Sequence, residues 1–159
     1  MVKPSPQPEK SPLERHANNG GGSESLIRVL VVDDNEPFRR FVRATLSTML
    51  GLQIVSEASD GLEGVQKAVE LQPALIVLDI GLPKLNGIEA GRRIRKLSPQ
   101  SKILFLTQES SAEVVQEAIS LGALGFVIKA HAARDLSAAL EAVLRNEQFI
   151  SSTLKTVDG

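Results

Sequence analysis

A buried strand that ends in a carboxylate constrains this chain more than any other feature. Residues 74–78 form an unbroken apolar run, which is typical of a central strand covered on both faces of a parallel sheet. A charge inside such a sheet is costly, so we expect Asp79 at the carboxyl end of the strand, where open α/β sheets bind ligands. Pro83 and the Asn86-Gly87 pair indicate that a loop follows. Asp79 is therefore a candidate nucleophile or metal ligand, and a helix-capping role is the structural alternative.

The chain around this strand alternates between apolar, β-rich runs and amphipathic helical patterns. Five predicted strands alternate with five predicted helices, which indicates a parallel sheet with helices on both faces. Because crossover connections are right-handed, the pattern favours a doubly wound sheet. The strands are predicted at 27–32, 52–58, 74–78, 102–106 and 124–128, and the helices at about 37–49, 61–71, 87–97, 111–121 and 132–144.

The two ends of the 159-residue chain depart from this alternation. Residues 1–25 contain several Pro, Asn and Gly residues and few large apolar side chains. Such a segment cannot bury enough surface to offset the entropy lost on ordering, so we predict a disordered tail. Residues 26–148 are predicted to form one folded domain, and residues 149–159 a C-terminal tail or the start of a linker.

The composition argues against several classes of function. A net charge of −1 gives no electrostatic support for binding nucleic acid or an anionic membrane. The lack of Cys excludes disulfides and thiolate metal sites, and two distant histidines do not suggest a zinc site. No apolar run approaches the roughly 18 residues of a membrane helix, and no signal peptide begins the chain. We therefore expect a soluble, cytoplasmic protein with no membrane contact and no direct contact with nucleic acid.

Four of the five predicted strands end in a polar residue. Asp33 and Asp34 follow the first strand, Asp79 the third, Thr107 the fourth and Lys129 the fifth. The carboxyl ends of parallel strands lie along one edge of the sheet, so these five side chains are expected to meet in one crevice. Each residue alone has an ordinary explanation as a cap, a turn residue or a solvated charge. Their coincidence at one edge favours a functional site.

The charges of these residues favour a metal-dependent phosphoryl site. Three neighbouring carboxylates raise one another's pKa unless a cation lies among them. Hard oxygen ligands favour Mg²⁺ or Mn²⁺, which retain waters and accept phosphate oxygens. Three carboxylates, one divalent cation and Lys129 together carry no net charge. Such a site can accept a phosphoryl group, whose oxygens the cation, Lys129 and Thr107 would hold.

In these features the sequence resembles the receiver domain of bacterial two-component response regulators, of the NarL/FixJ type. The resemblance spans about residues 26–154 and implies a flavodoxin-like (βα)5 fold with strand order 2-1-3-4-5. It implies a phosphoacceptor signalling domain rather than an enzyme, one that only assists its own phosphorylation and slow autodephosphorylation. The motifs that carry it are Val31-Val32-Asp33-Asp34, residues 78–83 with Asn86-Gly87, Leu106-Thr107 and residues 122–129.

The resemblance also implies a role for each acidic residue. Asp79 would accept a phosphoryl group from a histidine kinase. Asp34 would bind Mg²⁺ directly and Asp33 through a water molecule. Asp79 itself and the backbone carbonyl of Gly81 would complete the protein ligands of the cation.

The remaining site residues would act on the phosphoryl group and on the response to it. Thr107, Lys129 and the backbone N–H of Gln108 would hold the phosphoryl oxygens. Phe126 would be the aromatic switch residue, which turns inward as Thr107 moves toward the phosphoryl group. The switch would control partner binding or homodimerisation through the face formed by the fourth helix, the fifth strand and the fifth helix.

Three residues depart from the usual pattern of this family. Ala130 follows Lys129 where many members have Pro, Gln108 stands where a small residue is usual, and Phe126 lacks the hydroxyl of the common Tyr. No second domain follows before Gly159. The sequence leaves open a single-domain regulator and a truncated receiver.

Three other functions fit parts of the pattern. A nucleotide-binding domain needs a Gly-rich turn after the first strand, where Asp33-Asp34-Asn35-Glu36 would repel a pyrophosphate. Aspartyl phosphohydrolases also use Asp and Mg²⁺. Their two first-strand acids are separated by one residue, however, whereas Asp33 and Asp34 are adjacent. A degenerate receiver that only binds partners is disfavoured because every phosphorylation residue is present. The basic run 92–96 is better explained as a solvated helix face than as a nucleic-acid site.

Overall fold

The computed structural model describes residues 26–108 and 111–151. The predicted N-terminal tail, residues 1–25, and most of the predicted C-terminal tail, residues 152–159, lie outside the described residues. The strands are β1 (Ile27–Val32), β2 (Leu52–Ala58), β3 (Leu75–Asp79), β4 (Lys102–Thr107), β5 (Gly125–Ile128) and β6 (Phe149–Ile150). The helices are α2 (Glu36–Ser47), α3 (Gly61–Leu71), α4 (Gly87–Leu97), α5 (Ala112–Ser120), the 3₁₀ turn Lys129–His131 and α6 (Ala132–Leu144).

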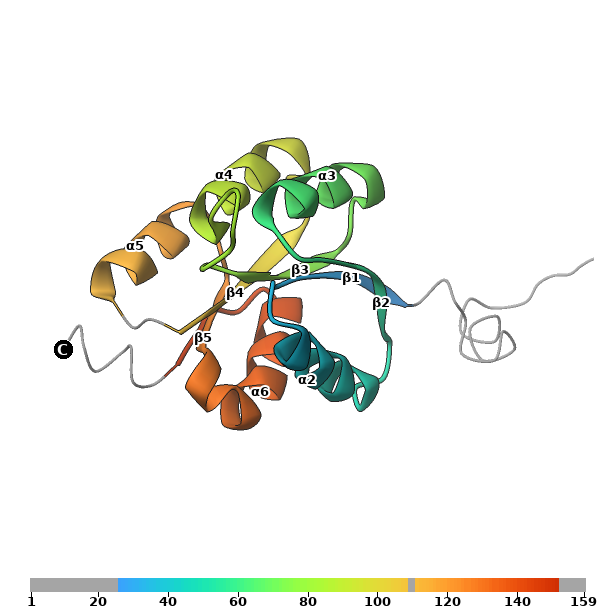
Figure 1. Cartoon of the computed structure of the whole chain (residues 1–159). Helices are drawn as coiled ribbons and strands as arrows, with labels where there is room; N and C mark the ends of the chain where they lie inside the picture. The colour runs from blue at the N-terminus through green and yellow to red at the C-terminus, as the bar shows by residue number, and fades with distance from the viewer. Residues whose placement is uncertain (1–25, 109–110, 152–159) are drawn as a thin grey trace, which may run out of the picture.

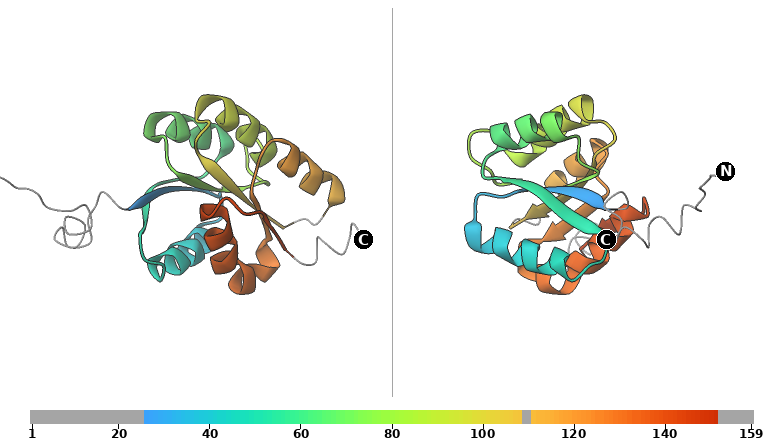
Figure 2. Two further views of the ribbon diagram at one scale, coloured as in Figure 1. Left: turned by 180° about the vertical axis from the view of Figure 1, so that it is seen from behind. Right: turned by 90° about the vertical axis from the view of Figure 1, so that its right-hand side faces the viewer.

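The strands form one parallel sheet in the order β2-β1-β3-β4-β5-β6. Helices α3, α4 and α5 cover one face, and α2 and α6 cover the other, as Figures 1 and 2 show. The predicted doubly wound α/β fold is therefore confirmed, with the predicted order for the first five strands. None of the helices within the described ranges combines the length and apolarity needed to cross a membrane.

The sixth strand was not predicted, because the folded domain was expected to end at residue 148. Phe149 pairs with Gly125 and Ile150 with Phe126, so this short strand extends the sheet beyond β5. The residue that follows it, Ser151, is buried and accepts a hydrogen bond from the Ile128 N–H. The first residues of the predicted tail therefore belong to the folded domain.

Side-chain caps begin four of the helices, and all four lie where the sequence changes from strand or loop to helical spacing. In each case a side-chain oxygen accepts hydrogen bonds from backbone N–H groups of the first turn, which have no partner inside the helix. Pro37 adds a residue preorganised for the first turn of α2. The capping residues are Asn35 for α2, Asp60 for α3, Asn86 for α4 and Ser111 for α5.

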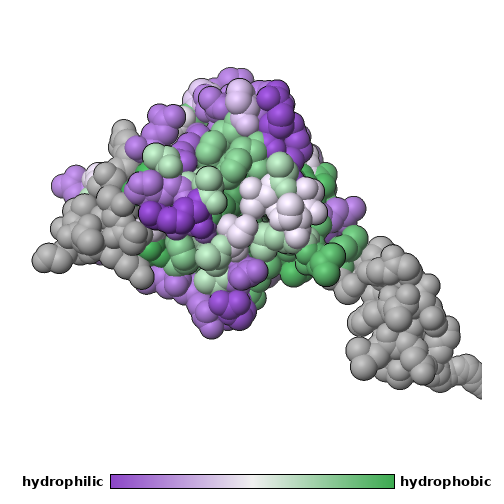
Figure 3. Space-filling model, turned by 90° about the horizontal axis from the view of Figure 1, so that it is seen from below, coloured by the Kyte–Doolittle hydropathy of each residue, from purple (hydrophilic) through white to green (hydrophobic). Residues whose placement is uncertain are grey.

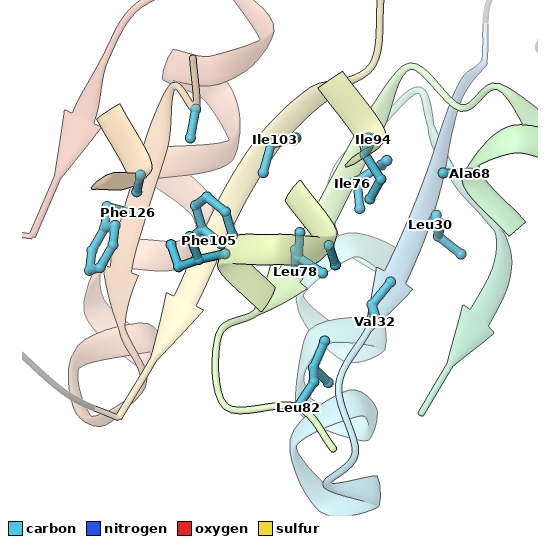
Figure 4. Close-up of a cluster of buried hydrophobic side chains, with 14 of the residues drawn as sticks. Leu30, Val32, Ala68, Ile76, Leu78, Leu82, Ile94, Ile103, Phe105 and Phe126 are labelled. Carbon is cyan, nitrogen blue, oxygen red and sulfur yellow. The ribbon is translucent and has the colours of Figure 1, made fainter. Parts of the chain in front are cut away.

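The core consists of two apolar layers, one on each face of the sheet, because successive strand residues point to opposite faces. On β1, Leu30 and Val32 pack toward α3 and α4, whereas Val29 and Val31 pack on the side of α2 and α6. Figure 4 shows the first layer. On the outer surface of the other layer, apolar areas lie among hydrophilic ones (Figure 3). The central strands are buried on both faces, so their polar end residues are fixed in position.

Candidate functional site

Four parallel strands bring the predicted site residues to one edge of the sheet. Asp79 is the last residue of β3 and pairs in register with Leu106 of β4. Thr107 follows at the end of β4 and pairs with Ile128, directly before Lys129. Asp33 follows β1, and its N–H continues the ladder by donating to the Ala58 carbonyl at 3.0 Å. The convergence expected from the strand ends is thus present.

Three carboxylates gather at this edge. One oxygen from each of Asp33, Asp34 and Asp79 lies within 4.8 Å of the other two. Asp33 and Asp79 are buried, whereas Asp34 is exposed. Two N–H groups hold the buried acids: Asn35 donates to Asp33 Oδ1 at 2.9 Å, and Gly81 donates to Asp79 Oδ1 at 3.2 Å. The second oxygen of each buried acid faces the Lys129 ammonium group.

Lys129 lies between the two buried acids. Its Nζ is 2.8 Å from Asp33 Oδ2 and 3.3 Å from Asp79 Oδ2, and its side chain is only 10% exposed. Within the described residues, Asp33 Oδ2 lacks a partner with hydrogen-bond geometry despite the close ion pair. One ammonium group therefore pairs with both buried carboxylates and leaves a buried oxygen of Asp33 incompletely satisfied. This oxygen-only donor set, with its excess of negative charge, fits a hard divalent cation.

The electrostatics of the site act most strongly on Asp79. Burial, and after it the negative charge of Asp33, raises the pKa of the Asp79 carboxyl above its ordinary value. The Lys129 ammonium and the Gly81 N–H lower this pKa and offset part of the rise. An added cation would favour the charged form of Asp79, which is the nucleophilic form.

Asp34 and Asp79 open onto a cleft of about 650 Å³ that Gly81, Thr107, Gln108 and Lys129 also line. Gln108 is exposed, and its side chain borders a second, smaller hollow beside Lys129. The loop after β3 is held close to the strand end at Gly87, where a Cβ atom would overlap the Asp79 carbonyl oxygen. The predicted Asn86-Gly87 turn is therefore a packing requirement of the site.

Phe126 lies outside this cleft. It is 2% exposed and packs in the core beside Phe105, with ring centroids 6.4 Å apart (Figure 4). The sequence predicts that Phe126 turns inward after phosphorylation, whereas the aromatic ring is already buried in this structure.

Two contacts to the site residues come from the first turns of α2 and were not predicted. The Phe38 ring lies under Lys129, with Nζ 4.7 Å from the ring centroid. Arg39 donates from Nη1 to the Asp33 carbonyl at 2.6 Å. From the sequence, Phe38 is only one of the apolar residues at helical spacing in the helix predicted at about 37–49. Nothing in the local pattern distinguishes Arg39 from its neighbour Arg40, which is exposed.

Comparison with known families supports the same assignment as this geometry. Residues 29–141, which contain every site residue named above, match the model of the response regulator receiver domain. The chain belongs to this family. The predicted resemblance is confirmed, and this chain carries a receiver domain with a phosphoacceptor signalling role in two-component regulation.

Known relatives of this receiver domain differ in what accompanies it. The chain is 40% identical over 117 residues to a protein-glutamate methylesterase/protein-glutamine glutaminase of Thermotoga maritima, covering 72% of this chain and 34% of that protein. It is 35% identical over 127 residues to the transcriptional regulatory protein LiaR of Bacillus subtilis, covering 80% of this chain and 60% of LiaR. The chain thus spans between a third and three fifths of the length of these two relatives.

A solved structure shows the same fold at a similar level of identity. The crystal structure of a LuxR-family two-component response regulator from Aurantimonas superposes with a TM-score of 0.78 at 31% identity. The match covers 83% of this chain and 94% of the Aurantimonas chain. The two chains therefore share the receiver fold.

Proposed function

We propose that Asp79 is the phosphoacceptor of this receiver domain. The position of its carboxylate is the main support for this proposal. The carboxylate lies at the end of a buried strand, beside two further acids, and its Oδ2 is 3.3 Å from Lys129 Nζ. An Asp79 carboxylate oxygen attacks the phosphorus atom of a phosphohistidine, forming an acyl phosphate as the donor's P–N bond breaks. The electron pair of that bond and a proton remain with the imidazole of the donor. The donor is accordingly a histidine kinase.

The acidic cluster supports the proposal that Mg²⁺, or Mn²⁺, assists this transfer. Asp34 would bind the cation directly and Asp33 through water, with Asp79 and the Gly81 carbonyl as further ligands. When bound, the cation neutralises charge that develops on the phosphoryl oxygens. The incompletely satisfied Asp33 oxygen and the mutual repulsion of the acids support this assignment.

The chain's own donors would hold the transferred group. Lys129 is a buried cation next to Asp79, and Thr107 ends the neighbouring strand. The backbone N–H of Gln108, which follows Thr107 at the cleft, would donate to a phosphoryl oxygen. These groups would stabilise negative charge on the phosphoryl oxygens.

The output of the switch is proposed to pass through the face of α5, β5 and α6. Phe126 lies on β5 two residues before Ile128, which pairs with Thr107. A shift in population at Thr107 and Phe126 would change this face and control a partner or a second copy of the chain. The receiver unit is proposed to act in the cytoplasm and to make no direct contact with nucleic acid itself.

Intact mass spectrometry tests the phosphoacceptor. Incubation with acetyl phosphate and Mg²⁺ should add one phosphoryl group to the wild type and none to Asp79→Asn. Asp60→Asn is the matched control, because it changes an acid that caps α3 and Asn caps equally well. Phosphorylation of Asp79→Asn, or an undiminished yield in EDTA, would refute the proposed site or its need for a metal.

A further inference from the structure

Arg39 connects the loop that carries the acids to two neighbouring elements. Its Nη1 donates to the Asp33 carbonyl at 2.6 Å, its Nε to Glu57 on β2 at 3.0 Å, and its Nη2 to Glu36 at 2.6 Å. The side chain is only 17% exposed, so these bonds are partly shielded from solvent. All three contacts use different nitrogens of one planar group, which a lysine cannot reproduce.

The carbonyl that Arg39 holds belongs to the peptide unit between Asp33 and Asp34. This unit is planar, so fixing its oxygen also fixes the rotation of the unit relative to both residues. Asp33 has further contacts through its N–H, through Oδ1 and through Lys129. Asp34, in contrast, is exposed and makes no side-chain hydrogen bond or ion pair with the residues that the structure describes. Its direction therefore depends on the backbone that Arg39 holds.

The charge of Arg39 is compensated where it lies. Glu36 and Glu57 each pair with the guanidinium, so it adds little net positive charge beside a cation site. A cation placed near another cation would otherwise weaken its binding. The arrangement keeps the directional hydrogen bond and removes most of the electrostatic cost.

We propose that Arg39 is a positioning residue for the divalent cation: by holding the peptide between Asp33 and Asp34, it orients these two acids, of which Asp34 lines the cleft. This inference rests on the proposed function of the acids. Arg39 itself binds neither the cation nor the phosphoryl group. Its removal leaves every ligand in the sequence but releases the backbone that orients them.

Arg43 offers a matched control one helical turn further along α2. It pairs with the same two acids, at 2.7 Å to both oxygens of Glu57 and at 3.1 Å to Glu36. It has no hydrogen bond to Asp33. Arg39→Met and Arg43→Met therefore both remove a guanidinium from the same ion-pair cluster, and only the first frees the Asp33 carbonyl.

The test is a Mg²⁺ titration of the full chain, followed by the amide signals of residues 33, 34 and 81 in NMR spectra. NMR suits this chain because it contains no Trp or Tyr for fluorescence. Removing a group that orients metal ligands typically weakens binding by about 10- to 100-fold, so we expect the Kd of Arg39→Met to rise about tenfold. Arg43→Met should stay within about twofold of the wild type, as for an exposed ion pair. Urea unfolding of both variants measures the accompanying loss of stability.

The outcomes separate this inference from the proposed function. A wild type that binds no Mg²⁺ and takes no phosphoryl group refutes the proposed function. A wild type that binds Mg²⁺, with Arg39→Met equally tight or with Arg43→Met equally weakened, refutes the positioning role alone. Arg39→Lys provides the test if Arg39→Met does not fold: it keeps the charge but not the three-way fork, and wild-type affinity in this variant also refutes the role.

Discussion

The two edges of the sheet that are formed by the amino ends and by the carboxyl ends of the strands bury polar groups in opposite ways. At the amino ends of the strands, Ser101 Oγ donates to the Pro73 carbonyl at 2.6 Å and lies 2.6 Å from Ser98 Oγ, which contacts Gln72 Oε1 at 3.2 Å. Both serines are fully buried and fully partnered. At the carboxyl ends, three acids lie close together, only two of them pair with the Lys129 ammonium group, and an oxygen of Asp33 lacks a well-directed hydrogen bond.

This difference separates structural from functional burial. The serine edge joins the loops before β3 and β4 with neutral hydrogen bonds, which stabilise the fold without favouring any ligand. The acidic edge has an excess of negative charge. Binding of a divalent cation there is therefore favourable, and the bound cation in turn favours a phosphoryl group. The acidic edge therefore contributes less to the stability of the fold than the serine edge does.

The largest effect is expected at the neutral edge. Ser101→Ala removes the donor to Pro73 and leaves Ser98 short of a partner, so the free energy of unfolding should fall by about 2 kcal/mol. Phosphorylation by acetyl phosphate should not change. Ser120→Ala is the control, because this exposed serine also bonds a backbone carbonyl, at 2.9 Å, and should cost no more than about 0.5 kcal/mol. Equal losses in urea unfolding would show that burial of the serine network adds nothing.

Much of the fold and of the acidic edge can be predicted from the sequence, because the patterns that indicate them are local. Apolar runs located the five strands, and the polar residues at the strand ends predicted the convergence of Asp79, Thr107 and Lys129. Strand β6 could not be predicted, since two residues carry no periodicity and their place depends on pairing with β5. The contact of Arg39 with Asp33 depends on the direction of a carbonyl, which no residue pattern records.

Access of water at the acidic edge is the next largest effect. Gln108 borders the cleft with a large, exposed side chain, where it can restrict in-line approach to an acyl phosphate on Asp79. Gln108→Ala should therefore hydrolyse its phosphoryl group about tenfold faster, equivalent to about 1.4 kcal/mol of barrier. Phosphorylation by small donors should also accelerate, since they use the same approach. Slower dephosphorylation would show that the amide assists the attacking water instead.

Asp79 and Asp135 provide a contrast between two buried carboxyls. The pKa of Asp79 is raised, above all by burial, so its ionised form destabilises the folded protein at pH values above its folded pKa. The pKa of Asp135 is lowered, above all by its hydrogen bonds from Arg134 and also by Ser151, so its ionised form stabilises the fold at neutral pH. The same Asp→Asn change should therefore have opposite signs at the two positions.

In EDTA at neutral pH, Asp79→Asn should raise the free energy of unfolding, because it removes a buried negative charge that burial and Asp33 disfavour. The gain should shrink as the pH falls toward the ordinary value of 3.8, where the unfolded carboxyl is also protonated. Asp135→Asn should lower stability at neutral pH, and its loss should diminish on acidification. Urea unfolding at several pH values measures both. A gain for Asp79→Asn that does not depend on pH would contradict the electrostatic explanation.

The smallest effect is expected where the acidic edge meets α2. The Phe38 ring lies 4.7 Å from Lys129 Nζ, and a cation–π contact of this kind contributes about 0.5–1 kcal/mol. Phe38→Leu keeps an apolar side chain but removes the π face that holds the ammonium group toward the acids. Phosphorylation by acetyl phosphate should then slow by about two- to fivefold. Phe41→Leu is the control, since Phe41 packs against Phe38 with ring centroids 5.4 Å apart and lies in the same apolar layer. If both variants slow the reaction equally, the packing of α2 sets the position of the Lys129 ammonium group, and the Phe38 ring has no specific role.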